Sequence, residues 1–147
     1  MLTSLAGLAF SANQSRHAAH STAIATVQHF MIESHKLWDE CDAAIAEQPP
    51  KLDRLTAVVG RIMGHFEVIV TLLADGAVQG KLQRLVAGTV RDYLDHMSQK
   101  GFSPYVQSGL DTDEVCENLK DFCLQRRAEF RNSEDVFDML KISKSSL

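Results

Sequence analysis

A repeat of apolar residues, spaced alternately by three and four positions, runs through the middle of this chain. It comprises Leu52, Leu55, Val59, Ile62, Phe66, Ile69 and Leu73. Because an α-helix completes a turn in about 3.6 residues, this spacing places all of these side chains on one face of a long helix. A helix with such a face buries it against other helices, so the sequence predicts a helical protein.

The size and composition of the chain predict a single domain over residues 1–147. The sequence is 45% hydrophobic and 23% charged, which is ordinary for a globular protein of this length. It has only 3 prolines, too few turn-forming residues for a protein of many β-strands. We expect flexible ends at residues 1–14 and 141–147.

Four helices are predicted along the chain. Their limits are near Ser15 and Glu47, near Pro50 and Ala74, near Ala77 and Lys100, and from the acidic segment Asp111–Glu114 onward. The apolar stripe of the first predicted helix is Ile24, Val27, Met31, Ser34, Trp38, Cys41 and Ile45. Phe102–Gly109 is expected to be a long loop. A break near Asn132-Ser133 would begin a short fifth helix.

Short connections between amphipathic helices favour antiparallel neighbours. The expected fold class is therefore all-α, an antiparallel up-down-up-down four-helix bundle, with the option of a short fifth C-terminal helix. Gly60 and Gly64 lie one turn apart on the second helix. Glycine lacks a Cβ atom, so this pair predicts a close approach by a neighbouring helix or by a bound partner.

Charge and cysteine content restrict the environment and the partners. The net charge of −4 argues against direct binding to the nucleic-acid backbone, which requires a basic face. The chain has 3 cysteines and no Cys-x-x-Cys pair, so free thiols in a reducing compartment are expected. It lacks a basic signal-peptide start, and no uninterrupted apolar run approaches the roughly 20 residues of a membrane span. A cytoplasmic location without membrane contact is expected.

Two histidines on successive predicted helices suggest a metal site. His35-Lys36-x-Trp38 followed by His65-Phe66 resembles the opening of a hemerythrin-like domain. The position four residues after His65 is Ile69, where that family has a carboxylate. The third predicted helix also lacks the family's pair of histidines. We therefore predict no cofactor. A hemerythrin-like metal or ligand-binding bundle, with His35 and His65 as candidate ligands, stays the alternative.

A second resemblance covers more of the chain. Gly64-His65-Phe66-Glu67-Val68 is similar to the Gly-His-Phe segment of the Rsd/AlgQ family, and three further segments follow in the same order as in that family. They are Phe30-Met31 with Leu37, Leu85-x-Ala87-x-Thr89 with Asp92-Tyr93-x-Asp95, and Arg127-x-Glu129-Phe130-x-x-Ser133-Glu134-Asp135. Proteins of this family are bacterial regulators that bind region 4 of the primary sigma factor.

This resemblance implies a non-enzymatic, anti-sigma type of transcription regulator. No glycine-rich phosphate loop, nucleophile elbow or paired carboxylates point to catalysis. The partner-binding residues it implies are Val59, Ile62, Gly64, His65 and Phe66, although Val59 and Ile62 replace polar residues of the family's contact face. The spacing of Phe66 equally allows a core position. A homodimeric interaction module of unknown role is the further alternative.

Overall fold

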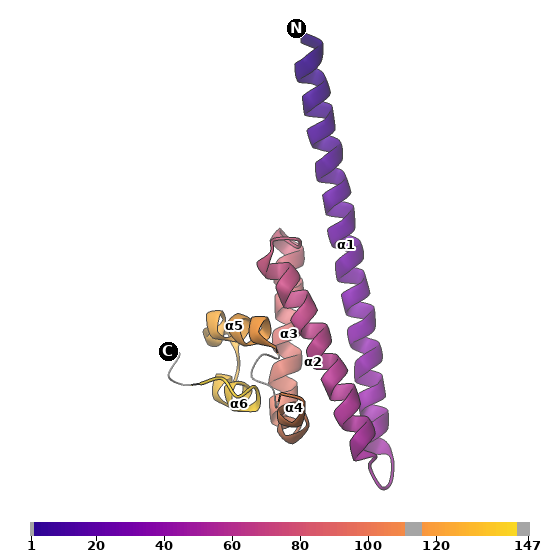
Figure 1. The fold of residues 1–147 in the computed structure, drawn as a ribbon, viewed down its shortest axis with the longest axis vertical. Helices are drawn as coiled ribbons and strands as arrows, with labels where there is room; N and C mark the ends of the chain where they lie inside the picture. The colour runs from indigo at the N-terminus through magenta and orange to yellow at the C-terminus, as the bar shows by residue number, and fades with distance from the viewer. Residues whose placement is uncertain (1, 111–115, 144–147) are drawn as a thin grey trace.

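The computed structural model describes residues 2–110 and 116–143, and within them every regular element is helical. The elements are α1 (Leu2–Ala46), α2 (Leu52–Ala74), α3 (Gly80–Gln99), α4 (Ser103–Gly109), α5 (Glu117–Gln125), a 3-10 turn (Arg127–Glu129) and α6 (Ser133–Met139). The all-α class is confirmed. The arrangement is three long helices followed by three short ones (Figure 1).

The three long helices run alternately up and down. Along α1 and α2, the ion pair of Glu47 with Arg54 is followed two turns on by the pair of Glu40 with Arg61. From the first pair to the second, the residue number falls along α1 and rises along α2, so the two helices are antiparallel. Met31 of α1 contacts Thr89 of α3, and Trp38 packs on Tyr93 further along. Both numbers rise together here, so α1 and α3 are parallel.

Helix α2 lies at the centre of the fold, because it packs against α1, α3, α4 and α5. Its predicted apolar face is buried from Leu55 to Leu73, whereas Leu52 at the helix start is 56% exposed. By length and composition alone, α2 is the one helix among the described residues that could cross a membrane, and the core helix of a helical bundle meets the same criteria.

The buried stripe of α1 differs from the predicted one by a rotation of the helix. Buried positions are Ala23, Val27, Phe30, Ser34, Leu37, Cys41 and Ala44. Ile24 and Ile45, which the sequence placed in the stripe, are 36% and 44% exposed. Both stripes have a three-four spacing. The buried stripe combines the small residues Ala23 and Ala44 with the large side chains of Phe30 and Leu37.

The C-terminal part does not form a fourth long helix. The predicted loop at 102–109 contains α4, which has Pro104 in its first turn, where the missing N–H of proline costs nothing. The predicted fourth helix is divided into α5 and α6, because Phe130 between them has an extended backbone. Asn132 caps α6 by accepting the Asp135 N–H. The predicted N-cap at Asp111–Glu114 lies outside the described residues.

Helix α1 extends well beyond the rest of the protein (Figure 1). It begins at Leu2 rather than near Ser15, and the side chains of residues 11–22 are all exposed. Further along, Ala19 and His20 lie near Ala77 and Leu82 in a depression. We call residues 2–18 the α1 extension. At 1.5 Å per residue its helix projects by about 25 Å.

Candidate protein-interaction surface

Phe66, the residue on which the sequence left core and interface open, lies in the core. Its side chain is 1% exposed and packs between the rings of Phe30 on α1 and Tyr93 on α3. The ring centroids are 6.3 and 5.7 Å apart, with tilted planes. This arrangement is the usual geometry of a packed aromatic cluster. Phe66 therefore holds the three long helices together and offers no surface to a partner.

His65 joins α2 to α1. Its ring stacks on Phe30 with centroids 4.9 Å apart, and its Nε2 atom lies 3.1 Å from the Ser34 hydroxyl and 3.2 Å from the Phe30 carbonyl. The Ser34 hydroxyl in turn donates to that same carbonyl. These contacts satisfy a buried serine in the interior of a helix, where an unpaired hydroxyl would be costly. The outer part of the imidazole stays accessible, because His65 is only partly buried.

Glu67 connects α2 to the C-terminal helices. Its carboxylate accepts the backbone N–H groups of Asn118 and Leu119 and the side-chain amide of Asn118, at 3.1, 2.8 and 2.8 Å. Both N–H groups belong to the first turn of α5, where a helix has no internal acceptors for them. The carboxylate thus caps α5 from another helix and favours the positive end of its dipole.

Val59 and Ile62 are likewise core residues, at 0% and 3% exposure. The expected binding face of Val59, Ile62 and Phe66 is therefore corrected, since buried side chains cannot contact a partner unless the core opens. Gly64 is exposed, and a Cβ atom added at Gly60 or Gly64 would meet nothing within 4 Å. The spacing of the two glycines had predicted a close approach by a helix or a partner, and the structure shows no such approach at either position.

The two histidines proposed as metal ligands are differently placed. His65 bonds to Ser34 and Phe30, whereas His35 is exposed. Within residues 2–110 and 116–143, no three His, Cys, Asp or Glu residues are grouped so that they could hold a metal ion. The described residues therefore give the hemerythrin-like alternative no ligand set.

All three cysteines are free and buried. Burial, followed by the charge of Asp42, raises the pKa of Cys41 to about 11. Burial, followed by the charge of Glu67, raises the pKa of Cys116 to about 11. Burial, with a contribution from Asp95, also raises the pKa of Cys123. A thiolate is the reactive form of cysteine, so these side chains act as packing groups at neutral pH.

An open groove lies between the parallel helices α1 and α3. At one end, a hollow of about 330 Å³ is lined by Trp38, Thr89, Asp92, Tyr93 and His96. The Trp38 ring forms its inner wall, with centroids 5.4 Å from Tyr93 and 5.1 Å from His96. The phenol of Tyr93 has a raised pKa, because burial and the charge of Asp39 both disfavour the phenolate.

Beyond this hollow, the same faces of α1 and α3 carry apolar side chains. Met31 on α1 is partly buried, and its sulfur lies 3.7 Å from the Thr89 hydroxyl. One turn before Thr89 on α3, Leu85 is 50% exposed, and Ile24 on α1 is 36% exposed. We define the α1–α3 groove by Ile24, Met31, Trp38, Leu85, Thr89, Asp92, Tyr93 and His96. Helices α5 and α6 lie on the side of α2 and α3 away from α1, whereas α4 begins beside α1, where the Phe102 ring lies 5.7 Å from the Trp38 ring (Figure 1).

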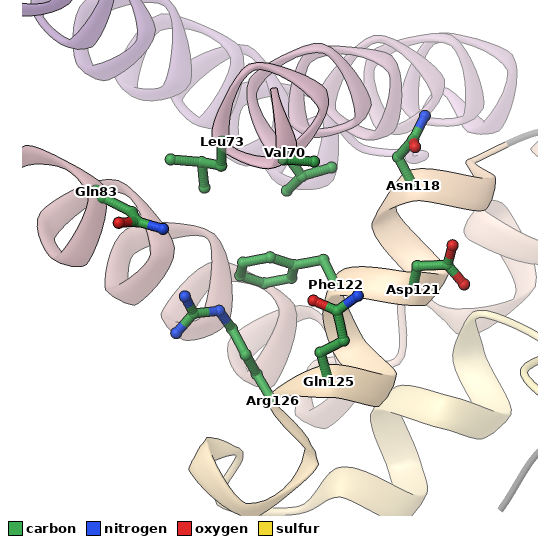
Figure 2. Close-up of a pocket in the computed structure, with 9 residues that line it drawn as sticks. Val70, Leu73, Gln83, Asn118, Asp121, Phe122, Gln125 and Arg126 are labelled. Carbon is green, nitrogen blue, oxygen red and sulfur yellow. The ribbon is translucent and has the colours of Figure 1, made fainter. Parts of the chain in front are cut away.

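A second concavity of about 330 Å³ lies between α2, α3 and α5. Figure 2 shows Val70, Leu73 and Phe122 on its apolar side, with Gln83 and Asn118 among the polar residues that surround them. Its one cationic side chain, Arg126, lies over the Phe122 ring and pairs with Glu129 at 3.0 Å. Its polar lining otherwise consists of amides and the Asp121 carboxylate.

A smaller hollow of about 160 Å³ is lined by Asp92, Asp95, His96, Gln99 and Arg131. Asp95 is 4% exposed, and one carboxylate oxygen accepts the Arg131 N–H at 3.2 Å. Its other oxygen, Oδ1, is buried without a hydrogen-bond partner. The bonded oxygen fixes the backbone that leads into α6, so Asp95 connects α3 to the C-terminal helices.

Sequence reasoning missed the α1–α3 groove, although Trp38 and Tyr93 were both noted. The available signal was the large apolar side chains beside the true stripe of α1, at Ile24, Met31 and Trp38. Comparison with protein families, with characterised proteins and with solved structures finds nothing that matches this chain.

Proposed function

We propose that this protein is a non-enzymatic interaction module that binds a helix of another protein chain in the α1–α3 groove. The observation that carries the proposal is the uncovered apolar strip from Ile24 and Leu85 to Trp38. In a four-helix bundle, a further long helix would cover that strip. A helix laid in an apolar groove is a common mode of protein recognition.

The chemistry of the groove favours a partner that is apolar with basic flanks. Trp38 and Tyr93 are the residue types that dominate binding energy at protein interfaces. Asp92 lines the same hollow, and Asp39 lies near Tyr93. Acidic groups beside an apolar strip attract a cationic partner and fix its orientation. The net charge of −4 likewise favours a cationic partner.

Region 4 of the primary sigma factor is one such partner to test, because the resemblance to Rsd/AlgQ regulators implies it. Of the five residues that carry that resemblance, Gly64 and Val68 are exposed and His65 and Glu67 are partly buried. Binding would thus have to use the groove rather than Phe66. In a titration with labelled region 4, Leu85→Glu should weaken binding and Val68→Glu should leave it unchanged.

The general proposal is tested by site-specific photo-crosslinking in the full chain. A benzophenone amino acid replaces Leu85 in the groove or, as the control, Val68, which is 62% exposed on α2 outside the groove. Position 85 should crosslink to a protein chain, and position 68 should not. No crosslink at position 85, or equal crosslinking at both positions, would overturn the proposal.

A further inference from the structure

Aromatic rings form walls of the hollow at the Trp38 end of the α1–α3 groove. The hollow has a volume of about 330 Å³, and Trp38, Tyr93 and His96 supply its rings. The plane of the Trp38 ring is inclined by 52° to that of Tyr93 and by 61° to that of His96. Rings inclined in this way form a corner rather than a flat surface, so a group that enters the hollow contacts more than one ring.

The charged groups around this hollow are more acidic than basic. Asp92 lines it, Asp39 acts electrostatically on the phenol in its wall, and Asp95 lines the smaller hollow that adjoins it. The cations beside them are Arg91, which pairs with Asp92, and Arg131, which lines the smaller hollow. Three carboxylates thus stand against two guanidinium groups. Their net negative charge favours a cation over an anion in the hollow.

Asp92 keeps a carboxylate oxygen available at the edge of the hollow. Arg91 donates to it from Nη2 and Nε, at 2.9 and 3.1 Å, and both hydrogen bonds go to Oδ1. Within the described part of the chain, no hydrogen bond engages Oδ2 of Asp92. The side chain is 61% exposed, so the carboxylate attracts a cation in the hollow while water still solvates it.

We propose that this hollow binds the methylated ammonium group of an organic cation. The face of an aromatic ring attracts a cation that lies within about 6 Å of its centroid, and tryptophan is the strongest of these rings. A primary ammonium group has three N–H donors that lose their water on entry. Methyl groups replace those donors with apolar surface, which packs on the rings. The inference goes beyond the proposed function, because a cation in the hollow needs no helix in the groove.

Trp38 is the only tryptophan of the chain, so its fluorescence reports directly on the hollow. The full chain is titrated with choline and, separately, with 3,3-dimethyl-1-butanol, in which a carbon atom replaces the charged nitrogen of choline. Choline should change the emission of Trp38 in a saturable way. The neutral compound has the same shape without the charge, and it should bind about tenfold more weakly.

One substitution at the edge of the hollow separates the contribution of charge from that of shape. Asp92→Asn should weaken choline binding about threefold and leave the neutral compound unaffected. Asp53 is an exposed carboxylate at the start of α2, so Asp53→Asn makes the same change in net charge outside the hollow. This control should bind choline as the wild type does. Trp38→Leu, followed by calorimetry, should abolish binding, and circular dichroism checks its fold.

A second pair of probes identifies the source of the ammonium group. One is a short alanine-flanked peptide that contains trimethyl-lysine, and the other is the same peptide with unmodified lysine. If the group belongs to a protein chain, the methylated peptide should bind more tightly than choline and the unmodified one more weakly. Tighter binding of choline than of either peptide would assign the hollow to a free small cation.

Three results would overturn the inference. The first is that choline and the methylated peptide bind in neither fluorescence nor calorimetry up to about 50 mM, beyond any useful affinity. The second is equal binding of choline and its neutral counterpart. The third is an equal effect of Asp92→Asn and Asp53→Asn. None of these results changes the crosslink expected at Leu85, so failure of the cation site is distinct from failure of the proposed function.

Discussion

The carboxylate of Glu67 on α2 accepts the backbone N–H of Leu119, in the first turn of α5, at 2.8 Å. These residues are 52 positions apart, so the cap of α5 is supplied by a different part of the chain. A capping carboxylate satisfies N–H groups that the helix itself leaves unpaired.

Glu67→Ala should lower the free energy of unfolding by about 1–2 kcal/mol, the usual loss for a removed helix cap. Chemical denaturation measures it. Amide hydrogen exchange should rise first in α5. Asp42→Asn, an exposed carboxylate on α1, is the control. Equal exchange rates in α5 for wild type and Glu67→Ala would show that the cap is unimportant.

Phe66→Ala should lower the free energy of unfolding by about 3–5 kcal/mol, because it empties a fully packed aromatic site. The neighbouring substitution Val68→Ala serves as the control, since Val68 is 62% exposed. That change should stay within about 0.5 kcal/mol. Comparable losses at positions 66 and 68 would contradict the inward orientation of Phe66.

Gly60→Ala and Gly64→Ala should each stabilise the protein by about 0.5–1 kcal/mol, because alanine favours the helix interior over glycine. A methyl group meets no atom within 4 Å at either site. Gly76→Ala should instead destabilise, since Gly76 has φ +72° and Gln79 lies 3.3 Å from the new Cβ. Melting temperatures of the three variants check this. A lower melting temperature for Gly64→Ala would instead indicate that another part of the protein approaches Gly64 closely.

Stability should fall as the pH rises above about 9. An unfolded cysteine thiol loses its proton near its ordinary pKa of 9.0, whereas the folded pKa of Cys41 and Cys116 is about 11. Between these values the folded state holds more protons, so rising pH favours unfolding. Denaturant titrations from pH 7 to 11 measure the decline. Cys41→Ala should be less stable at pH 7 and should decline less steeply. An unchanged slope would exclude Cys41 as a source.

The sequence predicted α2 and α3 well, because their periodic apolar positions leave one way to bury each helix. It did not orient α1, since two stripes with the same spacing run along that helix. The structure buries Ala23 and Ala44 and leaves Ile24 and Ile45 exposed. The spacing of apolar residues does not distinguish these two stripes.

The candidate site was less predictable than the fold. The segment Gly64–Val68 resembles an interaction motif, but three of its side chains, those of His65, Phe66 and Glu67, make contacts inside the protein. The groove stays open because the last helices, α5 and α6, pack mainly on α2, α3 and α4. The sequence predicted the break that shortens these helices, since α6 begins at Ser133 after the expected break near Asn132-Ser133.

The continuity of α1 has a consequence for how a single copy of the molecule tumbles. One unbroken helix joins the packed body to the projecting extension, and α2 and α3 follow roughly the same direction (Figure 1). Rotational diffusion of the monomer is therefore anisotropic. The N–H bonds of the long helices lie nearly parallel to the long axis of the molecule, which reorients slowly, whereas the N–H bonds of α5 lie across that axis. Nitrogen-15 relaxation rates should separate these two groups of amides even where both are equally rigid.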